Sequence, residues 1–406
     1  MANLLQRLFK RNASLENPST PLNASTLGNF AISSAGVSVN IDNALSVSPI
    51  WRAVRILGET IATIPVKIYR QEGNIKTEDR SHPLYYLFNI EPNRLYGAFN
   101  FWETITLHVA LHGNSYILIR KNRETAQPRL FEILEPSEIE VVKISPTQLQ
   151  YRNKKTSQRF TDREVLHFSN TSKNGLIGLS VLNTHATNIG IAIALRDYAA
   201  NFYKNGAQLS GVLKHPSKLT QDQYTRLKSS WVGQYGGSRN GGKTAILEEG
   251  MEYQHIGLKP ADAAYSESSK QIISEIARIW GVPTFLLEDL DRATFNNIEH
   301  LSQLFLKQTI RPWCKRFASE IIRKCFTREE IAAGYSVEFD FDDLLMADLE
   351  SRAEYNSKMV NSGIFSINEA RENANKNPIE NGDNHLVQMN LHTIDKAVIA
   401  TDADLQ

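Results

Sequence analysis

The fold of this chain is decided by residues 260–326, which read PADAAYSESSKQIISEIARIWGVPTFLLEDLDRATFNNIEHLSQLFLKQTIRPWCKRFASEIIRKCF. Apolar residues recur three and four positions apart over residues 261–280, and this spacing predicts a helix with one apolar face. Gly281 and Pro283 predict its end, because glycine readily adopts the left-handed conformation and proline cannot continue a helix. The same apolar spacing predicts a second, longer helix over residues 297–325.

The segment between these two predicted helices, residues 282–296, is polar and acidic. Its candidate functional residues are Glu288, Asp289, Asp291, Arg292 and Thr294. Pro312 lies inside the second helix and predicts a kink near residues 308–312, because proline removes a hydrogen bond and clashes with the preceding turn. Two helices joined by an exposed acidic loop indicate a projecting structural element rather than a catalytic pocket.

The bulk composition excludes several classes of protein. The chain has 406 residues, enough for two or three domains, and a formal net charge of +1. A charge near zero disfavours a protein that grips DNA tightly, because such proteins neutralise many phosphates with Lys and Arg. No stretch of about 20 apolar residues is present, so no transmembrane helix is expected. Residues 1–11 lack the long apolar core of a secretory signal.

The two cysteines, Cys314 and Cys325, both lie on the second predicted helix. Eleven positions separate them, about 16 Å along a helix axis, which is too far for a disulfide. No His residue stands at the spacing that a zinc site needs, and the acidic residues lack the spacing of a calcium loop. The sequence therefore predicts no metal ion and no cofactor, and it indicates a reducing cytoplasm.

Residues up to about 180 have the pattern of one α+β domain. Residues 1–46 lack periodicity and are expected to form a mobile arm. Ser48 is placed to cap a helix over residues 49–63, and another helix is expected over residues 100–111. Short strands are predicted over residues 66–70, 116–120, 130–134, 138–144, 149–152 and 164–167.

The second half of the chain places a compact insert between two predicted helices. One helix spans residues 181–203, and the chain returns through the helix over residues 261–280. The insert between them is predicted to contain a helix over residues 221–235 and strands over residues 211–214, 244–248 and 251–256. Further along, a strand is expected over residues 336–341 and helices over residues 348–360 and from Ser366, where Glu369 completes a capping box.

Residues 237–244 match the pattern of a phosphate-binding loop letter for letter, with Lys243 in the place of its lysine. Nucleotide binding requires a strand before the loop and a helix after it, so that helix N–H groups face the phosphate. Here the predicted order is inverted, because a helix precedes the pattern and a strand over residues 244–248 follows it. The pattern is therefore interpreted as an exposed basic loop.

No other motif supports a catalytic role. Gly178-Leu179-Ser180 resembles part of a nucleophile elbow but lacks the second glycine that the strained turn requires. The five tryptophans fall on apolar helical rows and are expected in the core. No residue is assigned to catalysis.

Short motifs in a fixed order carry a family resemblance over residues 47–385. They are Ile61–Tyr69 (IATIPVKIY), His82-Pro83-Leu84, Phe101-Trp102-Glu103, Gly113–Tyr116 (GNSY), Gly178-Leu179-Ser180, Phe202–Ala207 (FYKNGA), Ile276-Ala277-Arg278, Gly281-Val282-Pro283 and Gly363–Arg371 (GIFSINEAR). Together they resemble the portal proteins of tailed double-stranded DNA phages, in the compact form typical of siphoviruses. Glu288 departs from the family pattern, in which a glycine often follows the leucines.

The resemblance implies a portal-type α+β fold and a structural role for each part of the chain. These parts would be an arm (1–46), a wing (47–180 and 297–342, with the long kinked helix), two stem helices (181–206 and 261–281), a clip (207–260), a tunnel loop (282–296), a helical crown (343–378) and a flexible tail (379–406).

The resemblance also implies a function without catalysis. Twelve copies would form a ring at one capsid vertex of the virion, assembled in the host cytoplasm, and double-stranded DNA would pass through it without specific contacts. The tunnel-loop residues Glu288, Asp289, Asp291, Arg292 and Thr294 would lie at the narrowest point of the channel. The ring would meet the large subunit of terminase, a head-completion or adaptor protein, and the major capsid protein or scaffold. The clip residues Lys228, Arg239 and Lys243 are the candidates for partner docking.

Two other classes of function stay open as alternatives. One is a P-loop-type ATPase, for which the pattern over residues 237–244 is the sole argument. The other is a monomeric DNA-binding module. ATP binding by the Lys243→Ala variant would test the first, and the mass of the protein in solution would test the second.

Overall fold

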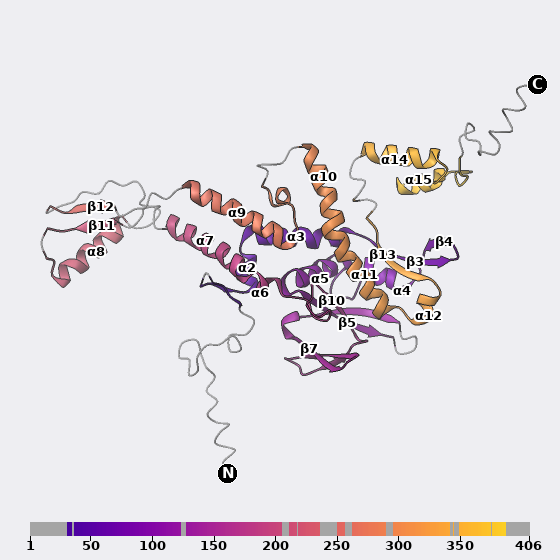
Figure 1. Cartoon of the computed structure of the whole chain (residues 1–406), viewed down its shortest axis with the longest axis horizontal. Coiled ribbons are helices and arrows are strands. Elements are labelled where there is room, and N and C mark those ends of the chain that lie inside the picture. The colour runs from indigo at the N-terminus through magenta and orange to yellow at the C-terminus, as the bar shows by residue number, and fades with distance from the viewer. Residues whose placement is uncertain are drawn as a thin grey trace, which may run out of the picture. The chain divides into compact units, whose positions relative to one another are not determined.

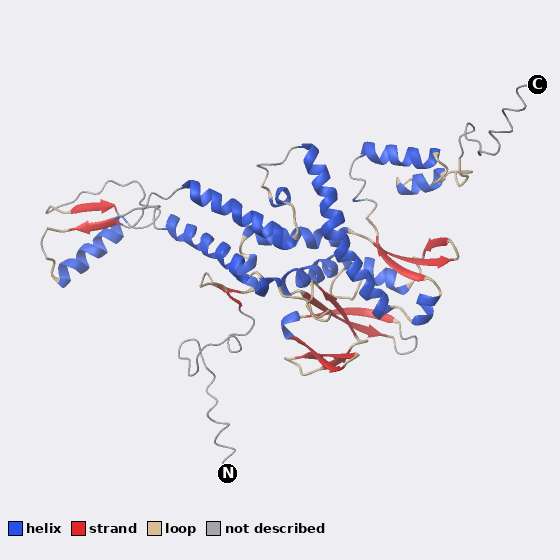
Figure 2. Ribbon diagram, viewed as in Figure 1, coloured by secondary structure: helices blue, strands red, loops and turns tan. Residues whose placement is uncertain are grey.

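The computed structural model describes residues 31–34, 36–122, 127–204, 211–216, 218–235, 250–255, 262–289, 295–341, 344, 349–374 and 376–386. The chain divides into two compact units, with the boundary between Phe339 and Asp340. Both units are drawn in Figure 1, and Figure 2 shows which segments are helix and which are strand.

The first unit contains most of the helices and all of the named strands. Its α-helices are α2 (Ile41–Leu45), α3 (Ser48–Thr63), α4 (Pro83–Asn89), α5 (Ala98–His112), α6 (Val181–Thr184), α7 (Ala186–Lys204), α8 (Gln221–Tyr235), α9 (Asp262–Trp280), α10 (Phe295–Phe305), α11 (Arg311–Cys325) and α12 (Arg328–Ala332). Its strands are β1 (Ala31–Ile32), β2 (Ser38–Val39), β3 (Val66–Glu72), β4 (Ile75–Glu78), β5 (Asn114–Lys121), β6 (Pro128–Leu134), β7 (Ile139–Ser145), β8 (Gln148–Asn153), β9 (Arg159–Thr161), β10 (Val165–Ser169), β11 (Gly211–Lys214), β12 (Glu252–His255) and β13 (Tyr335–Phe339).

Among the described residues, this unit has three three-stranded antiparallel sheets and two antiparallel strand pairs, β1-β2 and β11-β12. The strand orders of the three-stranded sheets are β10-β5-β6, β13-β3-β4 and β7-β8-β9. In the second of these sheets, Val337 of β13 lies opposite Ile68 of β3, so a late strand completes a sheet that begins near the start of the chain. Helices and antiparallel sheets in one unit confirm the predicted α+β class.

The core of the unit is rich in aromatic side chains. Trp102 of α5 lies fully buried, and its indole N–H donates to the carbonyl of Phe88 at 3.0 Å. Its ring lies 5.2 Å from that of Phe339 and 6.0 Å from that of Phe317, measured between ring centroids. Each such aromatic pair contributes about 0.5–1.5 kcal/mol beyond the area it buries. These contacts join α5, α11 and β13 into one core, although α11 and β13 follow far behind α5 in the sequence.

The long helix predicted over residues 297–325 is interrupted where the sequence places Pro312. α10 ends at Phe305, residues Leu306–Ile310 form a π-helical segment, η4, and α11 begins at Arg311. Proline lacks an N–H and clashes with the carbonyl of the preceding turn, and a widened turn relieves that clash. The predicted disturbance near residues 308–312 is therefore present as a π segment.

Helices α7 and α9 lie side by side in the first unit (Figure 1). Between them in the sequence come β11, α8 and β12, and β11 pairs with β12 so that Val212 lies opposite Gln254. The predicted helix over residues 221–235 is confirmed as α8. The helix predicted over residues 181–203 is wrong as one element, because the chain breaks at His185 between α6 and α7.

Part of the segment expected to be a mobile arm is ordered. Strands β1 and β2 form an antiparallel pair, which contacts α7. Asn40 then caps α2 in a capping box with Asn43, with both hydrogen bonds at 2.8 Å. Ser33 approaches α7 so closely at Gly190 that a Cβ there would clash with the Ser33 hydroxyl. Residues 1–30 lie outside the described part of the chain.

Two further local expectations are wrong. The cap of α3 is Val47, without a side-chain hydrogen bond. Ser48 is already the first residue of the helix, and Pro49 is the second. Trp51 on the same helix is 51% exposed, contrary to the expectation that it lies in the core.

Other local expectations are confirmed. Trp102 and Trp280 are buried as predicted. Cys314 and Cys325 are buried free thiols, so they do not form a disulfide.

In the described residues of the second unit lie the helices α14 (Leu349–Asn361) and α15 (Ile367–Asn373). The capping box predicted at Ser366 is confirmed: the Glu369 N–H donates to the Ser366 hydroxyl at 3.1 Å, and the Ser366 N–H donates to the Glu369 carboxylate at 2.7 Å. The rings of Tyr355 and Phe365 meet edge to face at 6.0 Å between centroids.

Candidate functional site

The acidic segment after α9 begins at a buried anchor. Trp280, the last residue of α9, is 5% exposed, and its indole N–H donates to the carbonyl of Ala110 in α5 at 3.0 Å. Gly281 follows with φ +66°, the left-handed conformation that the sequence predicts at this helix end. The N–H of Val282 donates back to Ala277 at 3.0 Å, which closes the last turn of α9.

Two residues that are distant in the sequence hold the start of the acidic segment. The Thr309 hydroxyl, in the π segment η4, donates to the carbonyl of Gly281 at 2.7 Å. Arg52 of α3 donates from Nε to the carbonyl of Leu286 at 3.2 Å. We call Arg52, Trp280, Gly281 and Thr309 the loop base. Sequence reasoning missed Arg52 and Thr309, because each contacts a residue far away in the chain and neither belongs to a recognisable motif.

The segment leaves the loop base through a short 3₁₀ turn, η3 (Thr284–Leu287). Leu287 is buried, and Glu288 follows in the left-handed conformation with φ +67° and ψ 20°. Backbone hydrogen bonds to Phe285 and Thr284 close the turn. A side chain other than glycine costs about 1–2 kcal/mol in this conformation. Glycine would therefore suit this position, which gives a physical reason for the family pattern from which Glu288 departs.

The described residues contain two of the five predicted tunnel-loop residues. Glu288 is exposed and Asp289 is half-buried. Asp291, Arg292 and Thr294 lie outside the described residues. The part that is described therefore carries two acidic side chains directly beyond a hydrogen-bonded base.

One of the three predicted clip residues is described. Lys228 lies on α8. Arg239 and Lys243, with the whole phosphate-loop pattern at residues 237–244, lie outside the described residues, as does the strand predicted over residues 244–248. The helix that ends at Tyr235 confirms that a helix precedes the pattern, which is the inverse of the order that nucleotide binding needs.

Ser180, the serine of the elbow-like motif, caps a helix. Its hydroxyl oxygen accepts from the Asn183 N–H at 3.3 Å and its hydroxyl donates to the carbonyl of Leu111 at 3.4 Å. Gly178 serves a close backbone approach, because a Cβ there would clash with the carbonyl oxygen of Gly113. The motif thus joins the start of α6 to the end of α5.

A buried polar network supports this junction. The Oδ1 atom of Asn114 accepts from the Gly178 N–H at 2.7 Å and lies 3.0 Å from Nε2 of His167. This arrangement places the His167 proton on Nε2, so that Nδ1 accepts from the Tyr151 hydroxyl at 3.3 Å. Burial, together with the nearby charge of Lys324, lowers the pKa of His167 to about 3. His167 is therefore neutral near pH 7 and positions the chain instead of carrying charge.

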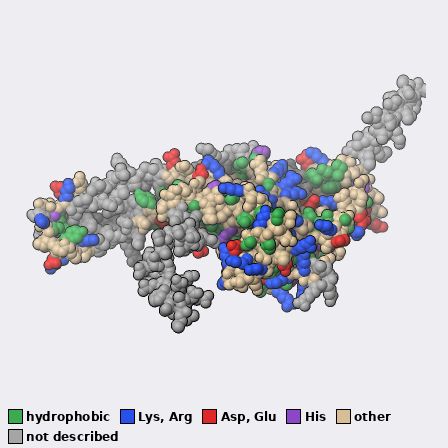
Figure 3. Space-filling view, turned by 60° about the horizontal axis from the view of Figure 1, so that its bottom comes forward, with side chains coloured by type: hydrophobic (Ala, Val, Ile, Leu, Met, Phe, Trp, Pro, Cys, Tyr) green, Lys and Arg blue, Asp and Glu red, His purple; other side chains and the backbone are tan. Residues whose placement is uncertain are grey.

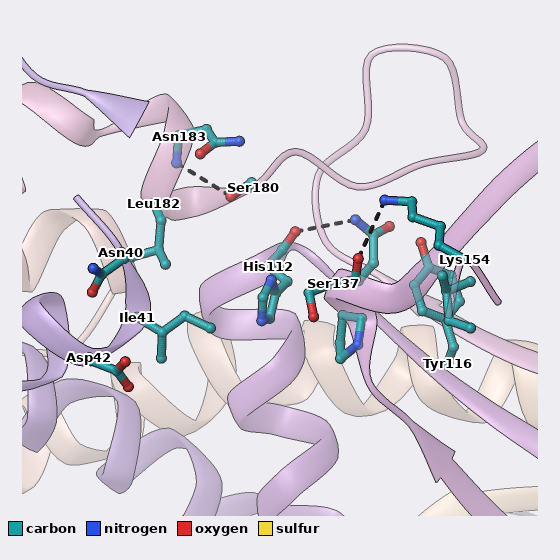
Figure 4. A pocket seen from close by; sticks show the side chains of 13 residues that line it. Asn40, Ile41, Asp42, His112, Tyr116, Ser137, Lys154, Ser180, Leu182 and Asn183 are labelled. Carbon is teal, nitrogen blue, oxygen red and sulfur yellow. Dashed lines mark hydrogen bonds between the residues drawn. The ribbon is translucent and has the colours of Figure 1, made fainter. Parts of the chain in front are cut away.

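A cavity of about 620 Å³ opens beside this junction (Figure 4). Its lining comes from α2, the end of α5, β5, β7 and α6. Lys154 donates to the carbonyl of Ser137 at 3.3 Å, and burial lowers the pKa of His112. These polar groups hold local elements together, and they do not form a nucleophile–base pair. The residues labelled in Figure 4 are Asn40, Ile41, Asp42, His112, Tyr116, Ser137, Lys154, Ser180, Leu182 and Asn183.

Among the described residues, no group of three or more His, Cys, Asp or Glu side chains is arranged to hold a metal ion. A search of the same residues finds no helix with the length and apolarity needed to cross a membrane.

Comparison with known proteins gives one family. The family model described as phage portal protein matches residues 48–375, which is most of the chain. The portal protein of Enterobacteria phage HK97 is 30% identical over 353 residues, covering 85% of this chain and 82% of that protein.

Solved structures show the same fold. A chain in the neck of an empty gene transfer agent particle, computed with C6 symmetry, matches with a TM-score of 0.59 and 21% identity over 83% of this chain and 93% of that chain. A chain in the neck of the native particle, computed with C12 symmetry, matches with a TM-score of 0.55 and 20% identity over 83% and 92% of the two chains.

Proposed function

The chain belongs to the phage portal protein family, and we propose that it assembles into a ring at one capsid vertex, through which double-stranded DNA is packaged and later ejected. The observation that carries this proposal is the family match over residues 48–375. The chain shares its fold with a protein in the neck of the native gene transfer agent particle, which was computed with C12 symmetry. This likeness supports a ring of twelve copies of the chain. A head-to-tail interface produces a closed ring when its rotation returns to the starting copy.

The fold supports a structural role for each segment. Pairing of β3 with β13 agrees with a wing that is made from residues 47–180 and 297–342. Helices α7 and α9, side by side, would form the stem, and β11, α8 and β12 between them would form the clip. The second unit contains the segment proposed as the crown.

Electron microscopy of the purified protein tests the proposal directly. Rings with an open centre are expected, and a mass in solution of about twelve chains should accompany them. A compact monomer with a filled centre would contradict the proposal, as would nucleotide binding that Lys243→Ala abolishes. The comparisons give no support to the ATPase alternative.

The acidic tunnel loop would keep DNA from sticking as it moves. Glu288, Asp289 and Asp291 would repel phosphate, with Arg292 reducing that repulsion. Particles that carry Glu288→Ala, Asp289→Ala and Asp291→Ala together should package DNA more slowly or stall.

A matched control neutralises Glu72 and Glu132, which lie on wing strands, and Glu135, which follows β6. All three residues are exposed, and particles with this control should package DNA normally. The measurement is the yield of packaged DNA per particle. An unchanged packaging yield in the tunnel-loop variant would contradict this role.

The clip would dock the large subunit of terminase during packaging and a head-completion or adaptor protein afterwards, while other surfaces meet the major capsid protein or scaffold. Lys228, Arg239 and Lys243 are the proposed docking residues. Lys228→Glu should weaken binding of the ring to the terminase subunit, because it reverses one charge on α8. Equal binding by the variant and the parent would remove Lys228 from this role.

A further inference from the structure

A groove between α3 and α5 presents apolar surface in the first unit. Leu45 at the end of α2, Trp51 on α3 and Leu107 on α5 line it, around a cavity of about 270 Å³. Trp51 is 51% exposed, and the two leucines are half-buried. Apolar surface left in water is unfavourable, so a partner that covers these side chains would stabilise the protein.

Exposed apolar atoms alone do not identify a docking site. Hydrophobic side chains lie among Lys, Arg and other polar side chains over much of the face drawn in Figure 3, as they do on most proteins. The groove differs because it is concave and because its charge is unbalanced. Arg55 in its lining pairs with Glu59 at 2.6 Å, whereas the Glu103 carboxylate, also in the lining, has no ion-pair partner among the described residues.

Glu103 is held at the groove by packing. A Cβ at Gly58 of α3 would lie 3.2 Å from the Cγ atom of Glu103, so the stem of Glu103 lies close against the α3 backbone. Its side chain is half-buried and cannot move far into water. The groove therefore carries one net negative charge, and a partner that fits it needs a cation at the edge of an apolar surface.

The size of the groove favours a short segment over a folded surface. Its volume of about 270 Å³ is just below the range of about 300–1,000 Å³ that pockets for small molecules occupy. It can therefore take a few side chains. An amphipathic helix binds a groove of this kind through apolar anchors three or four positions apart.

The chain itself contains such a segment, which lies outside the described residues. Residues 4–9, LLQRLF, are the most apolar stretch before β1. Its large apolar residues are Leu4, Leu5, Leu8 and Phe9. Pairs of them stand four apart, so a helix would place all four on one face. Arg7 and Arg11, also four apart, would lie along one edge of that face, where Glu103 requires a cation.

The chain is long enough to bring this segment to the groove. Leu45 in the groove lining stands fourteen residues after Ala31, so the start of β1 lies within about 50 Å of the groove. Residues 10–30 separate Phe9 from Ala31 and can span about 70 Å when extended. The segment and the groove belong to one chain, so docking also has the advantage of a high effective concentration.

We propose that residues 4–11 of the chain dock in the groove between α3 and α5 as a short helix. The apolar face of the segment covers Trp51, Leu45 and Leu107, and Arg7 and Arg11 lie beside Glu103. This contact goes beyond the proposed portal function, because it needs neither a ring nor DNA. Its effect is to cover an apolar surface that would otherwise bind other proteins non-specifically.

A thiol in the groove reports whether the segment covers it. Thr104 lines the groove, and Thr104→Cys places a thiol there in the full-length chain. Its rate of reaction with a maleimide is measured; the native thiols of Cys314 and Cys325 are buried and should not react on the same time scale. The test variant adds Leu5→Asp and Leu8→Asp. A matched control adds Leu15→Asp and Leu22→Asp, which change two leucines outside the segment.

We expect slow labelling of the Thr104→Cys protein and of the control. The test variant should react about tenfold faster or more, because two charges on the apolar face release the segment. All of these variants should keep the mass in solution and the urea midpoint of the parent.

A charge exchange tests the position of the segment. Glu103→Arg should speed labelling about two- to fivefold, because it places a cation beside Arg7 and Arg11. Adding Arg7→Glu and Arg11→Glu to Glu103→Arg should restore slow labelling. Only a segment that lies beside Glu103 gives this rescue.

Three results would overturn the proposal. Fast labelling of the Thr104→Cys protein without further changes would show an open groove. Slow labelling that persists in the test variant and is lost when copies dissociate on dilution would show that another surface of a second copy covers the groove. Charge exchange without rescue would remove the segment from Glu103. None of these results would affect the proposed ring, which the mass in solution tests separately.

Discussion

The buried anchors and the exposed charges of this protein differ in kind. The loop base and the network of Asn114, His167 and Gly178 are buried or hydrogen-bonded to distant parts of the chain. Glu288 at the loop is exposed, and so are Lys307 in η4 and Arg311 and Lys315 in α11. Changes at the anchors should therefore alter stability, and changes at the exposed charges should alter interactions with DNA at nearly constant stability.

The largest effect is expected from Trp280→Ala in the loop base. Removing a buried aromatic side chain costs about 3–5 kcal/mol, and the hydrogen bond to Ala110 is lost with it. Urea denaturation measures the free energy of unfolding. The matched control is Trp51→Ala. Because Trp51 is 51% exposed, its removal should lower the free energy of unfolding much less than Trp280→Ala does. Equal losses in the two variants would contradict the distinction between anchor and surface.

A smaller loss is expected from Gly178→Ala at the junction of α5 and α6. The added methyl group would clash with the Gly113 carbonyl oxygen and lie 2.8 Å from the Asn170 nitrogen, so the backbone must shift. Such overpacking costs about 1–3 kcal/mol in the free energy of unfolding, measured by urea denaturation.

The matched control for this variant is Gly97→Ala at the start of α5. A Cβ at Gly97 would lie 3.7 Å from the carbonyl oxygen of Ile90, which is an ordinary contact distance, and its φ of −79° suits alanine. The control should therefore lose less stability than Gly178→Ala. Unchanged stability in Gly178→Ala would show that the two backbones can move apart freely.

The His167 network predicts a pH dependence of stability. Its folded pKa, about 3, lies below the ordinary value of 6.5, so the unfolded chain binds the proton more readily at any pH between these values. Stability is therefore intact above pH 6.5 and falls on acidification, by about 1.4 kcal/mol per pH unit for this group. His108, with a pKa lowered to about 4 by burial, acts in the same direction.

The measurement compares the free energies of unfolding at about pH 6.5 and about pH 5. His167→Gln should reduce the acid loss by about 1.5–2 kcal/mol relative to the parent. An identical acid loss in the parent and His167→Gln would mean that other groups control it.

The smallest effect is expected at Glu288, where an exposed side chain meets a backbone constraint. Glu288→Gly should stabilise the protein by about 0.5–1 kcal/mol, because glycine avoids the steric cost of the left-handed conformation, although its greater loss of entropy on folding offsets part of this gain. Glu288→Val should have the opposite sign, because a β-branched residue fits this conformation poorly. Thermal unfolding of both variants measures the difference, and two shifts of the same sign would contradict the assignment.

Sequence patterns predict the elements that are long or have strong end signals. The predicted bounds of α8 match the observed ones, those of α9 differ by one residue, and two residues three apart identify the Ser366 capping box. Shorter elements are missed or misread. β1 and β2 have two residues each, too few to show a period, and they are ordered because Ser33 packs against Gly190 of α7.

For the candidate site, too, some features follow from the sequence and others only from the tertiary structure. The sequence by itself determined the family, the α+β class, the end of α9 at Gly281 and the acidic character of the loop, because periodicity, glycine and proline positions and charge are local properties. Only the tertiary structure decided that Arg52 and Thr309 hold the loop base and that Ser180 is a cap. Each of these depends on which distant atoms come within hydrogen-bonding distance, and that is fixed by packing of the whole core.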